Sequence, residues 1–228
     1  MDPLAGSRWS TPETVAGFVQ SSPNSVLMTF AADELRRVPA GVAIDLGCGA
    51  GRNAVPLATI GWRVVGLDLS WPMLAAATDR ARREGVTDRL QVARAPMDAL
   101  PVADGSADLV IAHGIWNLAR SAAEFRRGVR EAARVARAGA ALFVFTFSRR
   151  TLAAEAEPVA GEPFVFTQFS GEPQCFLTEA QLITELDAVG FVPDRAVPLR
   201  ELNLPRPGEL RVGMPPVIYE AGFRLSRR

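Results

Sequence analysis

The residues best suited to bind a ligand lie in one short stretch, "AIDLGCGAGRN", at positions 43–53. Glycine recurs there at Gly47, Gly49 and Gly51, close behind the acid Asp45. Because glycine has no side chain, a turn rich in it lets the backbone approach a ligand closely. Asp68 follows about 20 residues later, at the place where an acid can accept hydrogen bonds from both hydroxyls of a ribose. The pattern therefore predicts a nucleotide-binding turn.

The position of the third glycine distinguishes between classes of nucleotide-binding turn. A dinucleotide-binding turn has the pattern G-x-G-x-x-G and needs glycine or alanine at position 52. This chain has Arg52 there, and its own pattern is G-x-G-x-G. The bulk of Arg52 would obstruct the tight approach of a helix to a pyrophosphate. A flavin or nicotinamide enzyme is therefore disfavoured.

Composition excludes several other chemistries. None of the 25 basic residues is lysine, so Schiff-base chemistry, a pyridoxal site and a P-loop are not expected. Two distant cysteines, Cys48 and Cys175, and the single histidine, His113, leave too few ligands for a structural zinc, and we expect no metal. The formal net charge of zero argues against a nucleic-acid-binding surface.

Alternating strands and helices are expected to position these residues. Proline and glycine mark many of the boundaries, and Thr11 and Thr178 are expected helix caps. The pattern predicts an α/β fold with a Rossmann-like, doubly wound, seven-stranded sheet, mostly parallel with an antiparallel edge strand, and helices on both faces. One domain is expected to span 1–228. The expected strands are 42–46, 62–68, 89–95, 107–113 and 140–147, with a final antiparallel pair near 191–200 and 214–226. The region 11–38 is expected to be helical, as "TPETVAGFVQ" and then "SVLMTFAADELRRV", and the further expected helices are 52–60, 72–85, 121–139 and 178–190.

Four motifs occur in order over about residues 40 to 192. They are "AIDLGCGAGRN", "VVGLDLSWPML", "APMDALPVADGSADLVIAHG" and "LTEAQLITELDAVGF". Together they resemble the class I S-adenosylmethionine-dependent methyltransferase family. The "GRN" and "FLTEAQL" segments are similar to those of small-molecule methyltransferases of the tellurite and thiopurine type. The turn "RAGA" at 137–140 departs from the family pattern, which has a proline and two glycines before the fifth strand.

The resemblance implies S-adenosyl-L-methionine as the cofactor and assigns residues to it. Asp45 would fix the methionine ammonium and Asp68 the ribose hydroxyls, although Asp45 could instead be a turn former. Asp98 could be a loop cap and Met73 a core residue. The remaining implied contacts are Gly47, Gly49 and Gly51 under the methionine and ribose, Leu69 and Met73 on the adenine faces, and Asp98 with the Met97 amide at the adenine edge.

The acceptor side is less well defined by the sequence. His113, at the end of the fourth strand, is the candidate catalytic residue, and a general base is needed only if the acceptor still carries its proton. We expect an N-terminal helical cap, 1–38, and an insertion, 148–176, to cover the acceptor. The alternative is that the phenylalanines of the insertion pack a hairpin onto the sheet edge. The candidate substrate-binding residues are Trp9, Trp116, Asn117 and Arg149.

These observations predict in-line methyl transfer to a small-molecule acceptor. Two alternatives stay open: a non-catalytic, cofactor-binding regulatory module, and a methyltransferase that acts on a macromolecule. No apolar run is long enough to span a membrane, and the N-terminus does not have the pattern of a signal peptide. Both cysteines look free, so a cytoplasmic location is expected.

Overall fold

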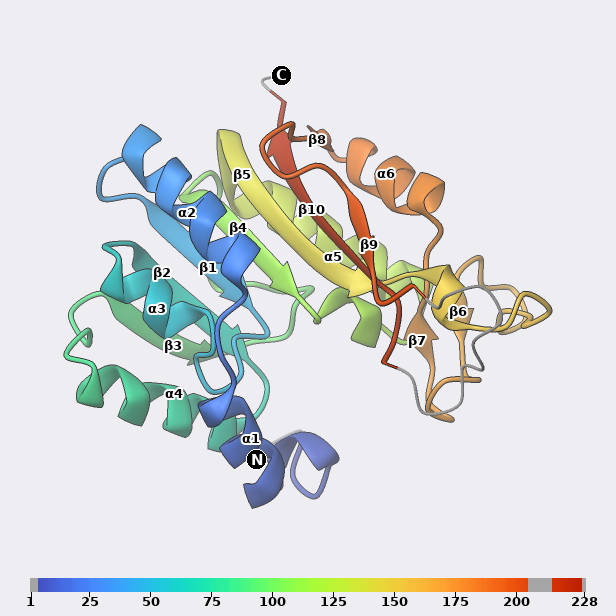
Figure 1. Cartoon of the computed structure of the whole chain (residues 1–228), viewed down its shortest axis with the longest axis horizontal. Helices are drawn as coiled ribbons and strands as arrows, with labels where there is room; N and C mark the ends of the chain where they lie inside the picture. The colour runs from blue at the N-terminus through green and yellow to red at the C-terminus, as the bar shows by residue number, and fades with distance from the viewer. Residues whose placement is uncertain (1–3, 205–214, 227–228) are drawn as a thin grey trace.

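The computed structural model describes residues 4–204 and 215–226, and its centre is one twisted sheet (Figure 1). Among the described residues eight strands form this sheet, in the order β3-β2-β1-β4-β5-β10-β8, with β9 also paired to β10. Strands β1 to β5 run parallel, as the sequence predicts. The strands are β1 Val42–Leu46, β2 Arg63–Asp68, β3 Leu90–Arg94, β4 Ala107–His113, β5 Ala136–Phe147, β8 Phe191–Pro193, β9 Arg200–Leu202 and β10 Ile218–Leu225.

The β10-β8 end of the sheet is antiparallel, as the sequence predicts. Strand β10 pairs antiparallel with β5 on one side and with β8 and β9 on the other. Its first six residues are buried, so this apolar segment is stable only with neighbours on both sides. Among the described residues, seven strands follow one another across the sheet, as the sequence predicts, and the short β9 pairs with β10 as an additional strand. The start of the predicted last strand, residue 214, lies outside the described residues.

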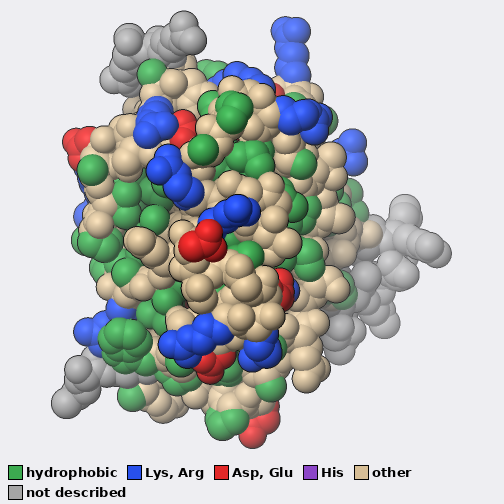
Figure 2. Space-filling view, turned by 90° about the vertical axis from the view of Figure 1, so that its left-hand side faces the viewer, with side chains coloured by type: hydrophobic (Ala, Val, Ile, Leu, Met, Phe, Trp, Pro, Cys, Tyr) green, Lys and Arg blue, Asp and Glu red, His purple; other side chains and the backbone are tan. Residues whose placement is uncertain are grey.

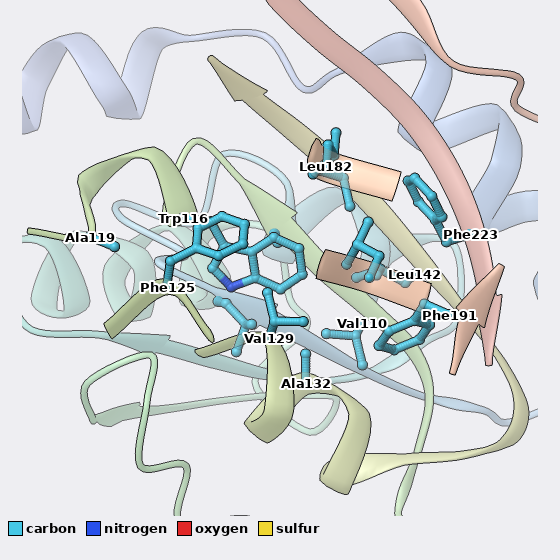
Figure 3. Packing of buried hydrophobic residues seen from close by; sticks show 14 of the residues in the cluster. Val110, Trp116, Ala119, Phe125, Val129, Ala132, Leu142, Leu182, Phe191 and Phe223 are labelled. Carbon is cyan, nitrogen blue, oxygen red and sulfur yellow. The ribbon is translucent and has the colours of Figure 1, made fainter. Parts of the chain in front are cut away.

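Helices cover both faces of the sheet. Helices α2, α3 and α4 pack on one face around Leu27, Leu57 and Leu74, and α5 and α6 pack on the other around Phe125 and Leu182. Figure 3 shows the second cluster, in which aromatic rings from several elements meet. The helices are α1 Pro12–Gln20, α2 Ser25–Arg37, α3 Ala54–Thr59, α4 Trp71–Arg83, α5 Ala122–Val135 and α6 Glu179–Asp187, with short 3-10 turns η1 Arg8–Ser10, η2 Trp116–Leu118 and η3 Arg149–Thr151.

Local signals predicted two helix starts correctly. The Thr11 side chain accepts a hydrogen bond from the Thr14 amide, and Pro12 occupies the first turn of α1. At α6, Thr178 and Gln181 form a reciprocal capping box. The helical region expected at 11–38 is two helices that match the two predicted stretches, because the chain leaves helical geometry after Gln20 and a new cap begins α2.

The helix predicted for 121–139 ends earlier, at Val135. Strand β5 begins at Ala136, which pairs with Ala107 of β4. The guanidinium of Arg137 also donates to both carboxylate oxygens of Asp108, at 2.7 and 2.9 Å. The segment "RAGA" therefore lies within β5, at a register shift between its pairs Ala136 with Ala107 and Ala141 with Leu109.

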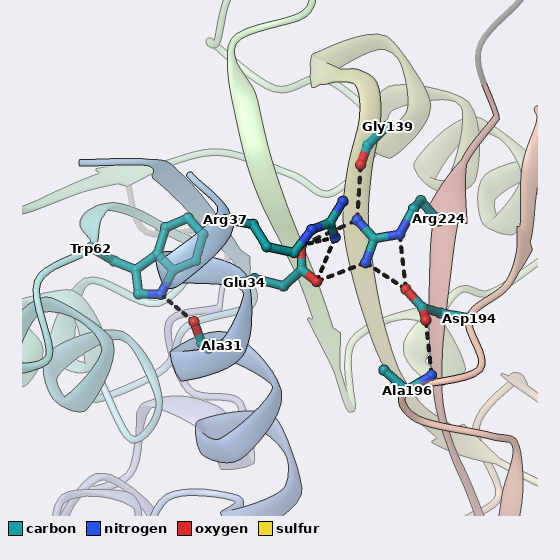
Figure 4. Close-up of polar contacts among 8 residues, drawn as sticks. All are labelled: Ala31, Glu34, Arg37, Trp62, Gly139, Asp194, Ala196 and Arg224. Carbon is teal, nitrogen blue, oxygen red and sulfur yellow. Dashed lines mark hydrogen bonds and ion pairs between the residues drawn. The ribbon is translucent and has the colours of Figure 1, made fainter. Parts of the chain in front are cut away.

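Helix α2 is part of the framework of the fold. Its buried Glu34 accepts hydrogen bonds from Arg224 of β10, at 2.7 and 3.1 Å, as Figure 4 shows. The carbonyl of Ala31 accepts from the indole of the fully buried Trp62, at 3.1 Å. The expected N-terminal cap, 1–38, therefore has two parts. Helix α2 packs into the core, whereas η1 and α1 contain no buried residues. Residues 1–3 fall outside the described part.

Charged side chains are mixed on the surface. Figure 2 views the molecule from the left-hand side of Figure 1 and shows arginines, acids and apolar side chains interspersed on that face. Several arginines pair with acids three or four residues away on the same helix, such as Arg80 with Glu84 at 2.8 Å. Such exposed pairs contribute little to stability, in general about 0–1 kcal/mol.

Candidate active site

The glycine turn lies between the carboxyl end of β1 and the start of α3. Gly47 and Gly51 have positive φ angles of 67° and 76°, which side chains rarely adopt. A Cβ added at Gly47 would lie 2.8 Å from Cδ1 of Ile115, and one added at Gly51 would lie 2.8 Å from Cγ2 of Val55. Both positions therefore need glycine for conformational and for steric reasons.

The acid at the end of β2 holds this turn in place. Asp68 accepts a hydrogen bond from the Gly49 amide at 2.9 Å and another from the Ser70 amide at 2.8 Å. Because β1 and β2 are adjacent and parallel, their carboxyl ends bring the turn and the acid together, as the sequence predicts. A carboxylate has about four lone-pair sites, so one such group can accept hydrogen bonds from backbone amides and from hydroxyls of a ligand together.

Asp45 is a buried acid without a full set of partners. Its side chain belongs to a residue that is only 2% exposed, and its Oδ2 has no hydrogen-bond partner among the described residues. Burial chiefly, and then the charge of Asp68, raise the pKa of Asp45 to about 7, against a hydrogen bond from the Ala54 backbone that lowers it. A cationic group at this oxygen would satisfy it and neutralise the charge. The methionine ammonium of S-adenosylmethionine fits this requirement.

The four residues predicted to contact the adenine differ in burial and in their neighbours. Met73 is buried on α4, and its sulfur lies 3.9 Å from the position that a Cβ of Gly49 would take. Leu69 and Met97 are partly buried, next to Asp68 and beside α5 respectively. Asp98 accepts a hydrogen bond from Arg127 of α5, at 2.9 Å. Its carboxylate therefore already has a cationic partner on a neighbouring helix.

His113 ends β4 at the same edge of the sheet as the glycine turn. Its ring stacks on Phe145 of β5, with centroids 4.1 Å apart and planes 6° from parallel. Its Nε2 lies 3.4 Å from the Nδ2 of Asn24. Burial chiefly, and then the charge of Arg52, lower the pKa of His113 to about 4, while a hydrogen bond with its own backbone opposes the shift. The ring is therefore neutral at pH 7.

The sequence analysis missed several polar residues that meet around His113. Asn24 caps α2, and its backbone amide donates to Oδ1 of Asn53, at 3.1 Å. Its Nδ2 donates to the buried Glu220 of β10, at 2.8 Å. Arg52 donates to the Ser22 carbonyl at 2.6 Å, so the "GRN" segment anchors the lead-in to α2. Two signals could have found them: an asparagine directly before a helical pattern, and an acid inside the apolar segment "VIYEAGF".

Trp9 lies against the start of α4, and its contact with an acceptor stays a prediction. Its carbonyl accepts a hydrogen bond from the Ser70 hydroxyl at 3.2 Å, and its ring meets Phe18 edge-on at 6.2 Å. Segment η1–α1 therefore lies against α4, beside the predicted cofactor contacts Asp68 and Leu69. This position follows from the packing of η1 and α1 on α4.

Trp116 and Asn117 lie inside the protein and not on an open pocket wall. Trp116 is fully buried, and its ring meets Phe125 of α5 at 5.9 Å (Figure 3). Asn117 is 3% exposed, and its Oδ1 has no partner among the described residues. The turn η2 directs the indole into the core, because so large an apolar surface is more stable there. The predicted roles of Trp116 and Asn117 at the acceptor both stay predictions.

The insertion 148–176 contains the hairpin of β6, Val165–Phe166, and β7, Gln174–Cys175. Arg149 donates hydrogen bonds to three backbone carbonyls of 153–156 and lies over the Phe166 ring, at 4.8 Å, so its guanidinium organises this loop. One phenylalanine, Phe169, is exposed, at 42%. The other three are buried, which agrees with the packed-hairpin alternative; they are Phe164, Phe166 and Phe176. Movement of the segment over an acceptor stays a prediction.

Comparison with known proteins indicates the family to which this chain is similar. The family described as "Methyltransferase domain" matches residues 44–144, which include the glycine turn, Asp68 and His113. Demethylmenaquinone methyltransferase of Corynebacterium glutamicum strain R is 30% identical over 209 residues, 87% of this chain and 80% of that protein. The 27-O-demethylrifamycin SV methyltransferase of Amycolatopsis mediterranei is 34% identical over 62% of this chain and 54% of that protein.

The fold is shared with a solved methyltransferase structure from Methanosarcina mazei. That structure covers 91% of this chain and 100% of its own, with a TM-score of 0.70 and 19% sequence identity. The chain therefore belongs to the S-adenosylmethionine-dependent methyltransferase family. It is an enzyme of that class, and its cofactor is S-adenosylmethionine. In the described part of the chain, no helix is both long and apolar enough to cross a membrane.

Proposed function

We propose that the enzyme transfers the methyl group to a small-molecule acceptor that binds beyond the carboxyl ends of β4 and β5, beside His113. The main structural support for the cofactor-binding part of this proposal is Asp45, a buried acid before the glycine turn whose Oδ2 has no hydrogen-bond partner among the described residues. The acceptor class is supported by two relatives, whose names give demethylmenaquinone and 27-O-demethylrifamycin SV as the compounds methylated.

Different residues of this chain would bind different parts of the cofactor. Asp45 binds the methionine ammonium, and Asp68 binds the ribose hydroxyls while it keeps the Gly49 amide in place. Leu69 and Met73 flank the adenine. Asp98 accepts from the adenine amine and shares its carboxylate with Arg127, while the Met97 amide lies beside it. When bound, S-adenosylmethionine supplies an electrophilic methyl group on a sulfonium.

The protein's part in the reaction is mainly to orient the acceptor. The acceptor must approach in line with the departing sulfur, and orientation of this kind can contribute about 7–11 kcal/mol in favourable cases. Positive charge disperses in the transition state, so an apolar site with no added cation favours the reaction. His113 and Phe145, stacked at the sheet edge, offer a neutral aromatic wall for such a site.

The cytoplasm is the proposed location, because both cysteines are free and buried, as is usual in a reducing compartment. Nucleic acid is not a proposed substrate, because the chain has no net charge.

Calorimetric titration with S-adenosylhomocysteine, followed by assays with radiolabelled S-adenosylmethionine, tests the proposal. The acceptor panel should contain quinones, hydroxylated aromatic compounds and amines, with tRNA and a mixed protein extract as macromolecular controls. We expect cofactor binding and label transfer to a small molecule. Label on tRNA or protein alone would contradict the acceptor class. Binding without turnover on any acceptor would favour the regulatory alternative.

A further inference from the structure

Asn24 connects three parts of the site that are far apart in the sequence. His113, Phe145 and Glu220 occupy paired positions on the neighbouring strands β4, β5 and β10. Asn24 lies at the first turn of α2 and contacts both ends of this row: its Nδ2 is 2.8 Å from Oε2 of Glu220 and 3.4 Å from Nε2 of His113. Its backbone is itself held by Asn53, next to the glycine turn.

The orientation of the Asn24 amide follows from its role as a helix cap. Its side-chain oxygen accepts a hydrogen bond from the Leu27 amide, at 2.9 Å, and only an oxygen can do so. Its NH2 group must therefore point toward Glu220 and His113, where a carboxylate accepts one of its two hydrogens. Reversing the amide would break the helix cap and place two oxygens against each other.

An amide NH2 can donate hydrogen bonds but cannot accept them. The Nε2 of His113 must therefore present a lone pair to Asn24, because a proton on Nε2 would point at a group that is also a donor. The single proton of the neutral ring then belongs on Nδ1. This assignment depends on the contacts of Asn24 alone and needs no bound ligand.

We propose that Asn24 is a positioning residue of the acceptor site, whose amide holds His113 as the neutral Nδ1–H tautomer while Glu220 anchors the amide. The functional part of this inference rests on the proposed acceptor position beside His113. The Nε2 lone pair is then occupied, so His113 acts as a neutral wall of the site and not as a general base.

The electrostatic surroundings of the ring support a neutral state. The positive charge of Arg52, from the turn after β1, disfavours a second cation, and it adds to the effect of burial on the pKa of His113. The carboxylate of Glu220, from β10, would favour the cation, but the Asn24 amide lies between them and takes its hydrogen bond. A neutral ring avoids repulsion with a sulfonium nearby.

The chain has a single histidine, so its NMR signals need no assignment. Long-range ¹H–¹⁵N spectra of the uniformly labelled, ligand-free protein, recorded from pH 4 to pH 8, give the tautomer and the pKa together. We expect one neutral tautomer with the proton on Nδ1, and half-protonation well below pH 6.5. The Nε2–H tautomer, or titration near pH 6.5, would overturn the proposal.

Asn24→Ser separates the two roles of the residue. Serine keeps a cap oxygen for α2 but has no amide to donate to His113 and Glu220. We expect the pKa of His113 to rise by about one unit, because the lost hydrogen bond had favoured the neutral ring. Thr178→Ala, which removes the cap of α6, is the control and should leave the histidine signals unchanged. Unchanged signals in Asn24→Ser would also overturn the proposal.

Kinetics and cofactor binding distinguish this inference from the proposed function. Once an acceptor is known, we expect kcat/KM of the wild type to show no histidine titration between pH 6 and 8. A fall on the acid side of that range would restore His113 as a base and contradict the inference. The NMR result does not depend on catalysis, whereas failure to bind S-adenosylhomocysteine would count against the cofactor site alone.

Discussion

Replacing Asp45 by asparagine should stabilise the ligand-free protein and at the same time weaken cofactor binding. The pKa of Asp45 is raised from 3.8 to about 7 because its charged form is buried. The folded state therefore binds the proton more tightly than the unfolded state does. Stability from this group is fully present below pH 3.8 and is lost as the pH rises to 7. Asparagine cannot ionise and avoids this loss.

The magnitude follows from the size of the shift. A change of one pKa unit corresponds to about 1.4 kcal/mol, so the raised pKa of Asp45 lowers the free energy of unfolding by roughly 4 kcal/mol at pH 8 and roughly 2 kcal/mol at pH 5, relative to a group that does not ionise. The gain in the free energy of unfolding of Asp45→Asn should therefore be roughly 2–3 kcal/mol larger at pH 8 than at pH 5. Urea denaturation at both values, without cofactor, measures the difference.

The same substitution removes the proposed partner of the methionine ammonium. A hydrogen bond to a charged group contributes about 1.5–3 kcal/mol, so affinity for S-adenosylhomocysteine should fall roughly 10- to 150-fold. Asp108→Asn is the matched control, because Asp108 is also a buried acid but is paired with Arg137. It should destabilise the protein and leave cofactor affinity unchanged. An equal stability gain at pH 5 and pH 8, or unchanged affinity of Asp45→Asn, would refute the reasoning.

Three further predictions concern neighbouring groups. Asp68→Ala should weaken S-adenosylhomocysteine binding by roughly 10- to 150-fold in calorimetry, through loss of the ribose contact, and an unchanged Kd would place the ribose elsewhere. The lowered pKa of His113 gives stability that is complete above pH 6.5 and falls by about 3 kcal/mol toward pH 4; urea denaturation should show this slope, and His113→Gln should lack it. Gly51→Ala should lower the free energy of unfolding by more than the roughly 1–2 kcal/mol that a left-handed residue costs in general, because the added Cβ would lie 2.8 Å from Cγ2 of Val55. Gly105→Ala is the control: Gly105 also has a positive φ, 58°, but no atom lies within 4 Å of an added Cβ, so only the backbone cost is expected.

Short-range patterns were enough to predict the cofactor half of the molecule. The strand before the glycine turn, the turn itself and Asp68 are encoded by neighbouring residues, since apolar periodicity and glycine spacing act over a few positions. Parallel pairing of β1 and β2 then brings the turn and the acid together at one edge, whatever the distant parts of the chain do.

Contacts between distant segments were decided only by the tertiary structure. Asn24 and Glu220 are 196 residues apart, and nothing local to either residue indicates the other. Whether Trp116 lines a pocket or fills the core depends on where α5 packs, and the burial of β10 between β5 and β8 depends on pairing at both of its edges. The sequence alone therefore determined the family, the cofactor turn and most of the sheet. The surroundings of His113 arise only when α2, β4 and β10 meet, because hydrogen bonds and side-chain packing depend on positions in space that local patterns do not contain.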